Sequence, residues 1–193
     1  MAVIIGLTGG IGSGKTTLVN YMESLGIPVF IADEEAKKVM QSPHVLDNVK
    51  ANFGNAIFEN GQLNRQQLAS IVFSNPEKLK ELNNIIHPEV KRQFAIWLDQ
   101  HKTVPFVVYE AAILFESGSY QNCDYIITVT AALEDRIIRV MQRDNCSREQ
   151  VLQRINAQWT DEERALKSNY VIDNTSTQSA KHEIDKILKI LKN

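Results

Sequence analysis

A glycine-rich segment near the start of the chain has the residues and the spacing needed to bind phosphate. Residues 9–16 read Gly-Gly-Ile-Gly-Ser-Gly-Lys-Thr and satisfy the pattern G-x-x-x-x-G-K-[ST]. Glycines let the backbone wrap a phosphate closely with its N–H groups pointing inward. We expect Lys15 to reach the β- and γ-phosphates of a nucleotide and the Thr16 hydroxyl to ligate magnesium. The residues expected to bind the nucleotide here are Gly10, Ile11, Gly12, Ser13, Gly14, Lys15, Thr16 and Thr17.

Arginines recur at helical spacing in the second half of the chain. Arg136, Arg139 and Arg143 step by three and four residues, so a helix would place them on one face. Guanidinium groups on a mobile flap suit phosphoryl transfer, because charge spreads over three phosphoryl oxygens and water must be excluded. The alternative is a solvated helix face, since acidic residues lie nearby. The guanine-reading Asn-Lys-x-Asp segment of a switch GTPase does not occur in the sequence.

Asp33 directly follows a short apolar segment at residues 27–31, which is expected to be a strand. Open α/β sheets bind their ligands at the carboxyl ends of the strands, where such a residue would lie. Asp33 can therefore orient an attacking hydroxyl and accept its proton. It can also serve as the N-cap of a helix, and the two roles are compatible.

Five apolar segments of the chain are expected to form strands. Their hydrophobicity is continuous, not alternating, which is typical of parallel strands that helices cover on both faces. The segments are residues 3–7, 27–31, 104–109, 125–129 and 170–172. Helical patterns follow the first segment at residues 15–25 and close the chain at residues 179–191. The sequence thus predicts an α/β fold of the P-loop NTPase type, with a parallel five-stranded sheet flanked by helices.

Two helical excursions are expected to interrupt this core. The first lies between the second and third strands and is longer than one crossover helix requires. The second covers residues 133–166, where Ser147 and Gln150 have capping-box spacing and start a fresh helix. Within the first excursion we expect helices at residues 33–40, 45–53, 65–73 and 88–100. A further helix is expected to start at Asn75-Pro76, with Asn75 as its N-cap, and Asn60-Gly61 is expected to form a turn.

Composition limits the class of protein. The chain has 193 residues, of which 44% are hydrophobic, enough for one substantial core. A net charge of -2 argues against a general nucleic-acid-binding protein, which needs a basic excess. The first residues lack the features of a signal peptide, and no apolar run approaches the length of a membrane span. We expect a cytoplasmic monomer or weak homo-oligomer without nucleic-acid or membrane partners, and with Cys123 and Cys146 reduced.

Beyond the phosphate loop, the sequence resembles the dephospho-CoA kinase family over nearly its whole length. Thr-Gly-Gly-Ile-Gly-Ser-Gly-Lys at residues 8–15 is highly characteristic of that family. Further similar segments occur in the family's order and spacing: Ala32-Asp33, Leu63-Asn64-Arg65, Leu82-Asn83, His87-Pro88, Leu114-Phe115-Glu116, residues 139–144, Ala157-Gln158 and residues 171–174.

The resemblance implies an activity and an organisation. The activity is transfer of the γ-phosphoryl group of ATP to the ribose 3′-hydroxyl of dephospho-CoA, giving CoA and ADP, with Mg²⁺ as cofactor. This reaction is the last step of coenzyme A synthesis. The organisation is a single kinase unit with a nucleotide-binding core at residues 1–32, 103–132 and 168–193, a helical CoA-binding insertion at 33–102 and a lid at 133–167.

The resemblance also assigns roles to particular residues. Asp33 is the expected catalytic carboxylate, and Lys15, Arg139 and Arg143 are the expected catalytic cations. Asn174 is expected to belong to the adenine pocket of ATP. The remaining assignments place Arg65 and His87 on the acceptor side, although His87 before Pro88 can equally be a structural cap that fixes a turn.

Two departures from the family pattern affect the expected site. Ile31 replaces the first aspartate of the common Asp-Ala-Asp, and residues 110–114 replace the frequent Asp-x-Pro-Leu-Leu. Glu110 is expected either to join Thr16 at the magnesium ion or to pair with the backbone or the lid. The rivals to this interpretation are another P-loop small-molecule or nucleotide kinase and a nucleotide-dependent switch, which would show no acceptor-stimulated turnover.

Overall fold

The computed structural model describes residues 2–192 of the chain. Residues 1 and 193, which the expected core includes, lie outside the described residues. Contacts between residues separate two compact units: one runs to Ile31 and resumes at Gln100, and the other is Ala32–Asp99. None of the helices within residues 2–192 combines the length and the apolar character needed to cross a membrane.

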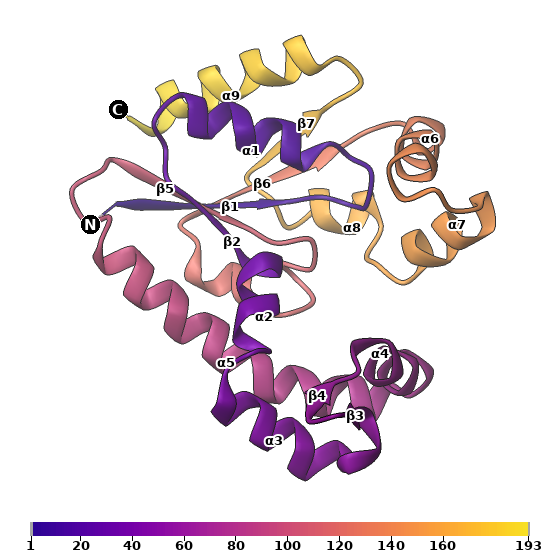
Figure 1. Ribbon diagram of the computed structural model, residues 1–193. Coiled ribbons are helices and arrows are strands. Elements are labelled where there is room, and N and C mark those ends of the chain that lie inside the picture. The colour runs from indigo at the N-terminus through magenta and orange to yellow at the C-terminus, as the bar shows by residue number, and fades with distance from the viewer. Residues whose placement is uncertain (1, 193) are drawn as a thin grey trace. The chain divides into compact units, whose positions relative to one another are not determined.

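A five-stranded parallel sheet forms the centre of the larger unit (Figure 1). The strand order is β2-β5-β1-β6-β7, and each neighbouring pair is parallel. Leu7 of the central strand lies opposite Glu110, and Thr8 opposite Thr128, so the strands end at a common edge. The predicted sheet is confirmed. The strands are β1 (Val3–Thr8), β2 (Val29–Ile31), β5 (Phe106–Glu110), β6 (Tyr125–Thr130) and β7 (Tyr170–Asp173).

Helices α1 (Lys15–Ser24) and α9 (Thr177–Leu191) lie next to each other against one face of this sheet (Figure 1). Their apolar stripes are buried together with side chains of the strands, at roughly 25 cal/mol of stabilisation per Å² of apolar area. Ile184, Ile187 and Leu188 form a buried stripe on α9, and Leu191 packs partly against it. This core fixes the strand β1 and the helix α1 that flank the glycine-rich segment.

The second helical excursion consists of α6 (Leu133–Asp144), α7 (Arg148–Asn156) and the short α8 (Asp161–Ala165), and it follows β6. The predicted capping box of Ser147 and Gln150 starts α7, with both of its hydrogen bonds present. A second capping box, made by Thr160 and Glu163, starts α8, a separate short helix that was not expected. A short 3₁₀ helix, η2 (Ser119–Asn122), precedes β6.

Neither of the two cysteines forms a disulfide within the described part of the chain. Both Cys123 and Cys146 are free thiols. Burial, helped by the charge of Asp124, raises the pKa of the Cys123 thiol to about 12, so this group stays protonated at neutral pH.

The smaller unit is helical, and its longest helix contacts each of the other three. A 3₁₀ turn and a two-stranded hairpin connect α3 to α4. The elements are α2 (Ala32–Val39), α3 (Pro43–Phe53), η1 (Asn55–Ile57), β3 (Phe58–Glu59), β4 (Gln62–Leu63), α4 (Arg65–Ser74) and α5 (Pro76–Asp99).

Two features of the smaller unit differ from the sequence-based expectation. Helix α5 continues through Pro88, where a break between two helices was expected. A proline at that position removes one helical hydrogen bond, but Leu82, Ile86, Val90 and Phe94 are buried at steps of four residues on both sides of it. Packing of this continuous stripe therefore outweighs the lost bond, and the predicted break at Pro88 is wrong.

The turn at Asn60-Gly61 is confirmed, but it connects two strands that were not predicted. Asn60 and Gly61 have φ values of 49° and 77°, as a tight hairpin turn requires. The paired strands β3 and β4 contain only two residues each. Segments this short carry no readable alternation, so the sequence revealed the turn and not the strands.

Candidate active site

The glycine-rich loop connects β1 to α1 at the carboxyl edge of the sheet. Gly12 and Gly14 have φ values of 80° and 89°, which side chains rarely adopt. A Cβ atom on Gly14 would lie 2.0 Å from Nδ2 of Asn174, and one on Gly12 would lie 2.5 Å from the carbonyl oxygen of Arg136. These two glycines are therefore required both by backbone conformation and by the close approach of neighbouring groups.

Lys15, at the first position of α1, lies inside this loop. Its Nζ donates to the carbonyl oxygen of Gly9 at 2.8 Å and lies 4.0 Å from Oε1 of Glu110. Both charged side chains are nearly buried, with 12% and 10% of their surface exposed. Glu110 ends β5, so the sheet brings its carboxylate to the lysine that is expected to bind phosphate. Thr16 lies in the exposed first turn of α1.

Arg139 and Asn174 meet on another side of the loop. The Arg139 guanidinium donates to the carbonyl oxygens of Asn174 at 3.1 Å and of Gly12 at 3.4 Å. Asn174, just after β7, is buried, and its Nδ2 donates to the carbonyl oxygen of Ser13 at 2.9 Å. The two residues thus brace the backbone of the loop. A role of Asn174 in an adenine pocket stays a prediction.

Arg136 and Gln158 hold the tip of the loop at Ile11. Nε of Arg136 donates to the carbonyl oxygen of Ile11 at 3.0 Å, and the N–H of Ile11 donates to Oε1 of Gln158 at 2.9 Å. Arg136 is buried, with 6% of its surface exposed. The helical spacing of the arginines was the available signal for Arg136, but its contact with the loop backbone was not predicted.

Arg143, one helical turn after Arg139, lies in a different environment. Its side chain is 61% exposed and binds the carboxylate of Asp144 at 2.7 Å. Arg154 of α7 binds the same carboxylate at 2.7 Å. The hydrogen bond from Arg143, supported by Arg154, lowers the pKa of Asp144 to about 2. Of the expected catalytic arginines, Arg139 is at the loop, and the role of Arg143 at ATP stays a prediction.

Comparison with known proteins decides the family. The model of the family described as CoaE, dephospho-CoA kinase, matches residues 3–180. The chain belongs to the dephospho-CoA kinase family. A dephospho-CoA kinase of Bacteroides fragilis (strain YCH46) is 41% identical over 175 residues, which cover 90% of this chain and 85% of that protein. The resemblance inferred from the sequence motifs is confirmed.

Two solved structures show how far the similarity of fold extends. A crystal structure of a Thermus thermophilus protein has a TM-score of 0.90 and 36% identity, covering 98% of this chain and 97% of that one. The dephospho-CoA kinase from Campylobacter jejuni has a TM-score of 0.70 and 28% identity, covering 98% of this chain and 96% of that one. The described fold is therefore shared with a solved dephospho-CoA kinase.

The remaining residues that were expected to act in a dephospho-CoA kinase lie in the smaller unit. Asp33 is exposed and is the second residue of α2, which begins at Ala32, so the expectation that it caps this helix is wrong. Arg65 is exposed at the start of α4 and donates to the carbonyl oxygen of Lys37 at 3.4 Å. His87 is half-buried, and burial lowers its pKa. Since α5 continues past it, His87 does not cap a turn.

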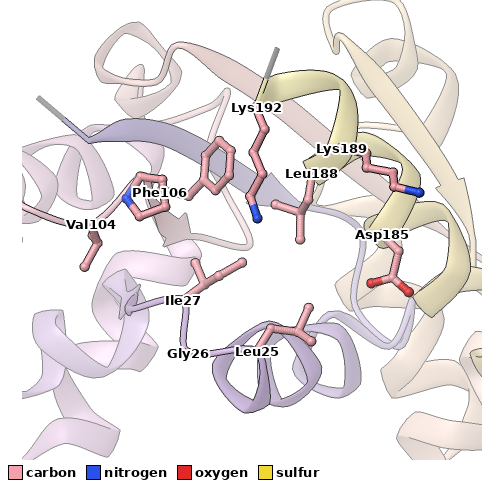
Figure 2. A pocket seen from close by; sticks show the side chains of 10 residues that line it. Leu25, Gly26, Ile27, Val104, Phe106, Asp185, Leu188, Lys189 and Lys192 are labelled. Atoms are coloured by element: carbon pink, nitrogen blue, oxygen red, sulfur yellow. The ribbon is translucent and has the colours of Figure 1, made fainter.

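A cavity of about 400 Å³ occurs at the opposite, amino-terminal edge of the sheet (Figure 2). Phe106, the first residue of β5, lines it, whereas the candidate site lies at Glu110, the last residue of the same strand. Leu25, Ile27 and Leu188 give the cavity an apolar lining (Figure 2). It contains none of the residues expected to bind nucleotide or acceptor and does not belong to the kinase site.

Proposed function

We propose that this member of the dephospho-CoA kinase family transfers the γ-phosphoryl group of ATP to the ribose 3′-hydroxyl of dephospho-CoA, giving CoA and ADP. The observation that carries the proposal is the braced phosphate loop with Lys15 at its centre, in a chain that matches the family over residues 3–180. The positive end of α1 and the N–H groups of the loop favour an anionic phosphate.

The loop and Asn174, which braces it, also have polar atoms without hydrogen-bond partners. Among residues 2–192, Ser13 Oγ and Asn174 Oδ1 are buried without a hydrogen-bond partner. A buried polar group without a hydrogen bond costs about 1–3 kcal/mol. A ligand that forms a hydrogen bond with either atom removes this cost, which favours its binding. These atoms support binding of a polar ligand, such as a nucleotide, against the loop.

In the proposed reaction the charged side chains divide the work. Lys15 neutralises charge on the β- and γ-phosphates, and the guanidiniums of Arg139 and Arg143 bind the phosphoryl oxygens, which carry most charge during transfer. Asp33 accepts the proton of the 3′-hydroxyl as its oxygen attacks the γ-phosphorus. The bond from phosphorus to the bridging oxygen of ADP breaks as the new ester bond forms. Arg65 and His87 bind the acceptor.

The residues present fit a magnesium ion. Thr16 and Glu110 are hard oxygen donors of the kind that Mg²⁺ prefers, and the Glu110 carboxylate lies within 4.0 Å of the phosphate-loop lysine. We propose that these two side chains hold the ion together with the phosphates of ATP. When bound, Mg²⁺ neutralises negative charge on the phosphate oxygens. Glu110 has the alternative role of pairing with Lys15.

A coupled assay of ADP release tests the proposed function. Turnover of ATP should rise strongly when dephospho-CoA is added, and it should not rise when nucleoside monophosphates are added. Stimulation by a nucleoside monophosphate alone would favour the rival kinase class. ATP turnover that ignores every acceptor would contradict the assignment of a kinase.

A further inference from the structure

Ile11, at the tip of the phosphate loop, is held by three separate contacts. Its N–H donates to Gln158 and its carbonyl oxygen accepts from Arg136, at 2.9 and 3.0 Å. Its side chain packs against the small core that joins α6 to α7, formed by Ile137, Val140 and Val151. Both polar backbone groups of one loop residue are thus occupied by side chains more than a hundred residues away in the sequence.

Arg136 is in turn the first member of a row of alternating charges, in which both arginines are buried and both carboxylates are partly exposed. Its Nη1 donates to Oδ2 of Asp161 at 2.9 Å, and Oδ1 of Asp161 lies 3.6 Å from Nη1 of Arg164. Nη2 of Arg164 donates to Oε1 of Glu116 at 3.3 Å. We call Arg136, Asp161, Arg164 and Glu116 the charge row. Arg164 is fully buried, and removing one partner from such a row leaves an uncompensated charge, so its members hold each other in place.

The far end of the charge row holds the backbone next to Gln158 in place. Trp159, the next residue in the chain, donates its backbone N–H to Oε1 of Glu116 at 3.2 Å. Its ring stacks on Phe115, with centroids 5.5 Å apart and planes 6° apart. Glu116 therefore anchors the backbone next to Gln158. At the other end of the charge row, Arg136 binds Ile11, the same loop residue that Gln158 binds.

We propose that Gln158 and the charge row are positioning residues, which hold the phosphate loop in the conformation that binds ATP. They keep Ile11 in place, so that the loop presents its N–H groups to phosphate without first being ordered by it. A site ordered in advance binds more tightly, because less conformational entropy is lost on binding. The inference rests on the proposed use of ATP, and it requires none of these side chains to touch the nucleotide.

Variants of the full chain test the proposal. Gln158→Met keeps the length of the side chain but removes the acceptor for the Ile11 N–H, and Asp161→Asn removes the charge that holds Arg136. Gln153→Met, at an exposed position of α7, is the matched control. The measurements are the Kd for ATP by calorimetry, the KM for dephospho-CoA, and hydrogen exchange of the Ile11 amide by NMR.

Gln158→Met should weaken ATP binding at least about tenfold, or 1.4 kcal/mol, and should speed exchange of the Ile11 amide by a similar factor. The KM for dephospho-CoA should stay within about twofold, because the loop binds ATP and not the acceptor. Asp161→Asn should weaken ATP binding in the same way. The double variant should lose less than the sum, since both changes act on one residue. Gln153→Met should behave like the unaltered chain.

Several results would overturn the proposal. Unchanged ATP affinity with unchanged Ile11 exchange in Gln158→Met would do so, as would tighter ATP binding, which would make Gln158 a competitor of phosphate. A lower melting temperature of Asp161→Asn with normal ATP affinity would show that the charge row has only a structural role. If Asp161→Asn does not fold, Gln158→Met alone decides. Failure of the proposed function would be recognised separately, because the unaltered chain would then show no turnover stimulated by dephospho-CoA.

Discussion

Replacing Gly14 by alanine should damage the phosphate loop in a way that can be separated into two parts. The first is the backbone conformation, since Gly14 has a φ of 89° and an alanine in the left-handed region costs about 1–2 kcal/mol. The second is steric, since the new Cβ would lie 2.0 Å from Nδ2 of Asn174. The Asn174 amide must then move and release the carbonyl oxygen of Ser13, which it binds at 2.9 Å.

The steric part adds the cost of a buried group left without its partner, about 1–3 kcal/mol. We therefore expect Gly14→Ala to lower the free energy of unfolding by about 2–5 kcal/mol. Gly26→Ala is the matched control, because Gly26 has a φ of 77° but nothing within 4 Å of the added methyl group. It should lose only the backbone part, about 1–2 kcal/mol.

Urea unfolding of both variants, with ATP affinity measured alongside, separates the two parts. Gly14→Ala should bind ATP at least about tenfold more weakly, or 1.4 kcal/mol, and Gly26→Ala should bind it normally. Adding Asn174→Ala should cost less stability in the Gly14→Ala background than in the unaltered chain, because the clash is then relieved. Equal losses of stability in the two glycine variants, with full additivity of Asn174→Ala, would refute this reasoning.

Five further substitutions test individual side chains. Lys15→Ala should leave a folded protein with kcat lowered more than about tenfold, and a smaller loss would remove Lys15 from catalysis. Asp33→Asn should lower kcat strongly at an unchanged melting temperature, whereas lost stability with normal kcat would exclude the catalytic role. Arg139→Lys and Arg143→Lys should each lower kcat more than they raise the KM for ATP, and normal turnover of both variants would remove these arginines from catalysis. Asp144 should contribute to stability above its ordinary pKa of 3.8, and this contribution should be lost as the pH falls toward its pKa of about 2 in the folded protein. Acid titrations of stability should show this loss in the unaltered chain and not in Asp144→Asn.

The elements that build the sheet could be predicted because their signals are local. Continuous apolar runs, the glycine pattern before Lys15 and the capping spacing of Ser147 and Gln150 each identify an element from neighbouring residues. The continuation of α5 through Pro88 could not be predicted, because it depends on packing of a helix face against other helices. Local propensity argued for a break there, and tertiary contacts decided otherwise.

The candidate site shows the same division. The glycine-rich loop and Lys15 could be found from the motif alone, and the position of Arg139 on the facing helix from helical spacing. The hold of Gln158 on Ile11 joins residues 147 positions apart, and no local pattern indicates such a contact. Spacing also grouped Arg143 with Arg139, but the acidic neighbour Asp144 binds the Arg143 guanidinium. Contacts between distant segments thus set which of the arginines on this helix reach the loop: Arg136 and Arg139 do, and Arg143 binds Asp144 instead.

The central claim is that the γ-phosphoryl group of ATP moves to the ribose 3′-hydroxyl of dephospho-CoA. The most direct test is to incubate the unaltered chain with dephospho-CoA and ATP labelled in its γ-phosphoryl group, and to locate the label in the product by ³¹P NMR and mass spectrometry. The account predicts that the label appears in a phosphomonoester at the 3′ position, in equal amount to the ADP formed. Label found only in inorganic phosphate, or at any other position of the acceptor, would contradict it.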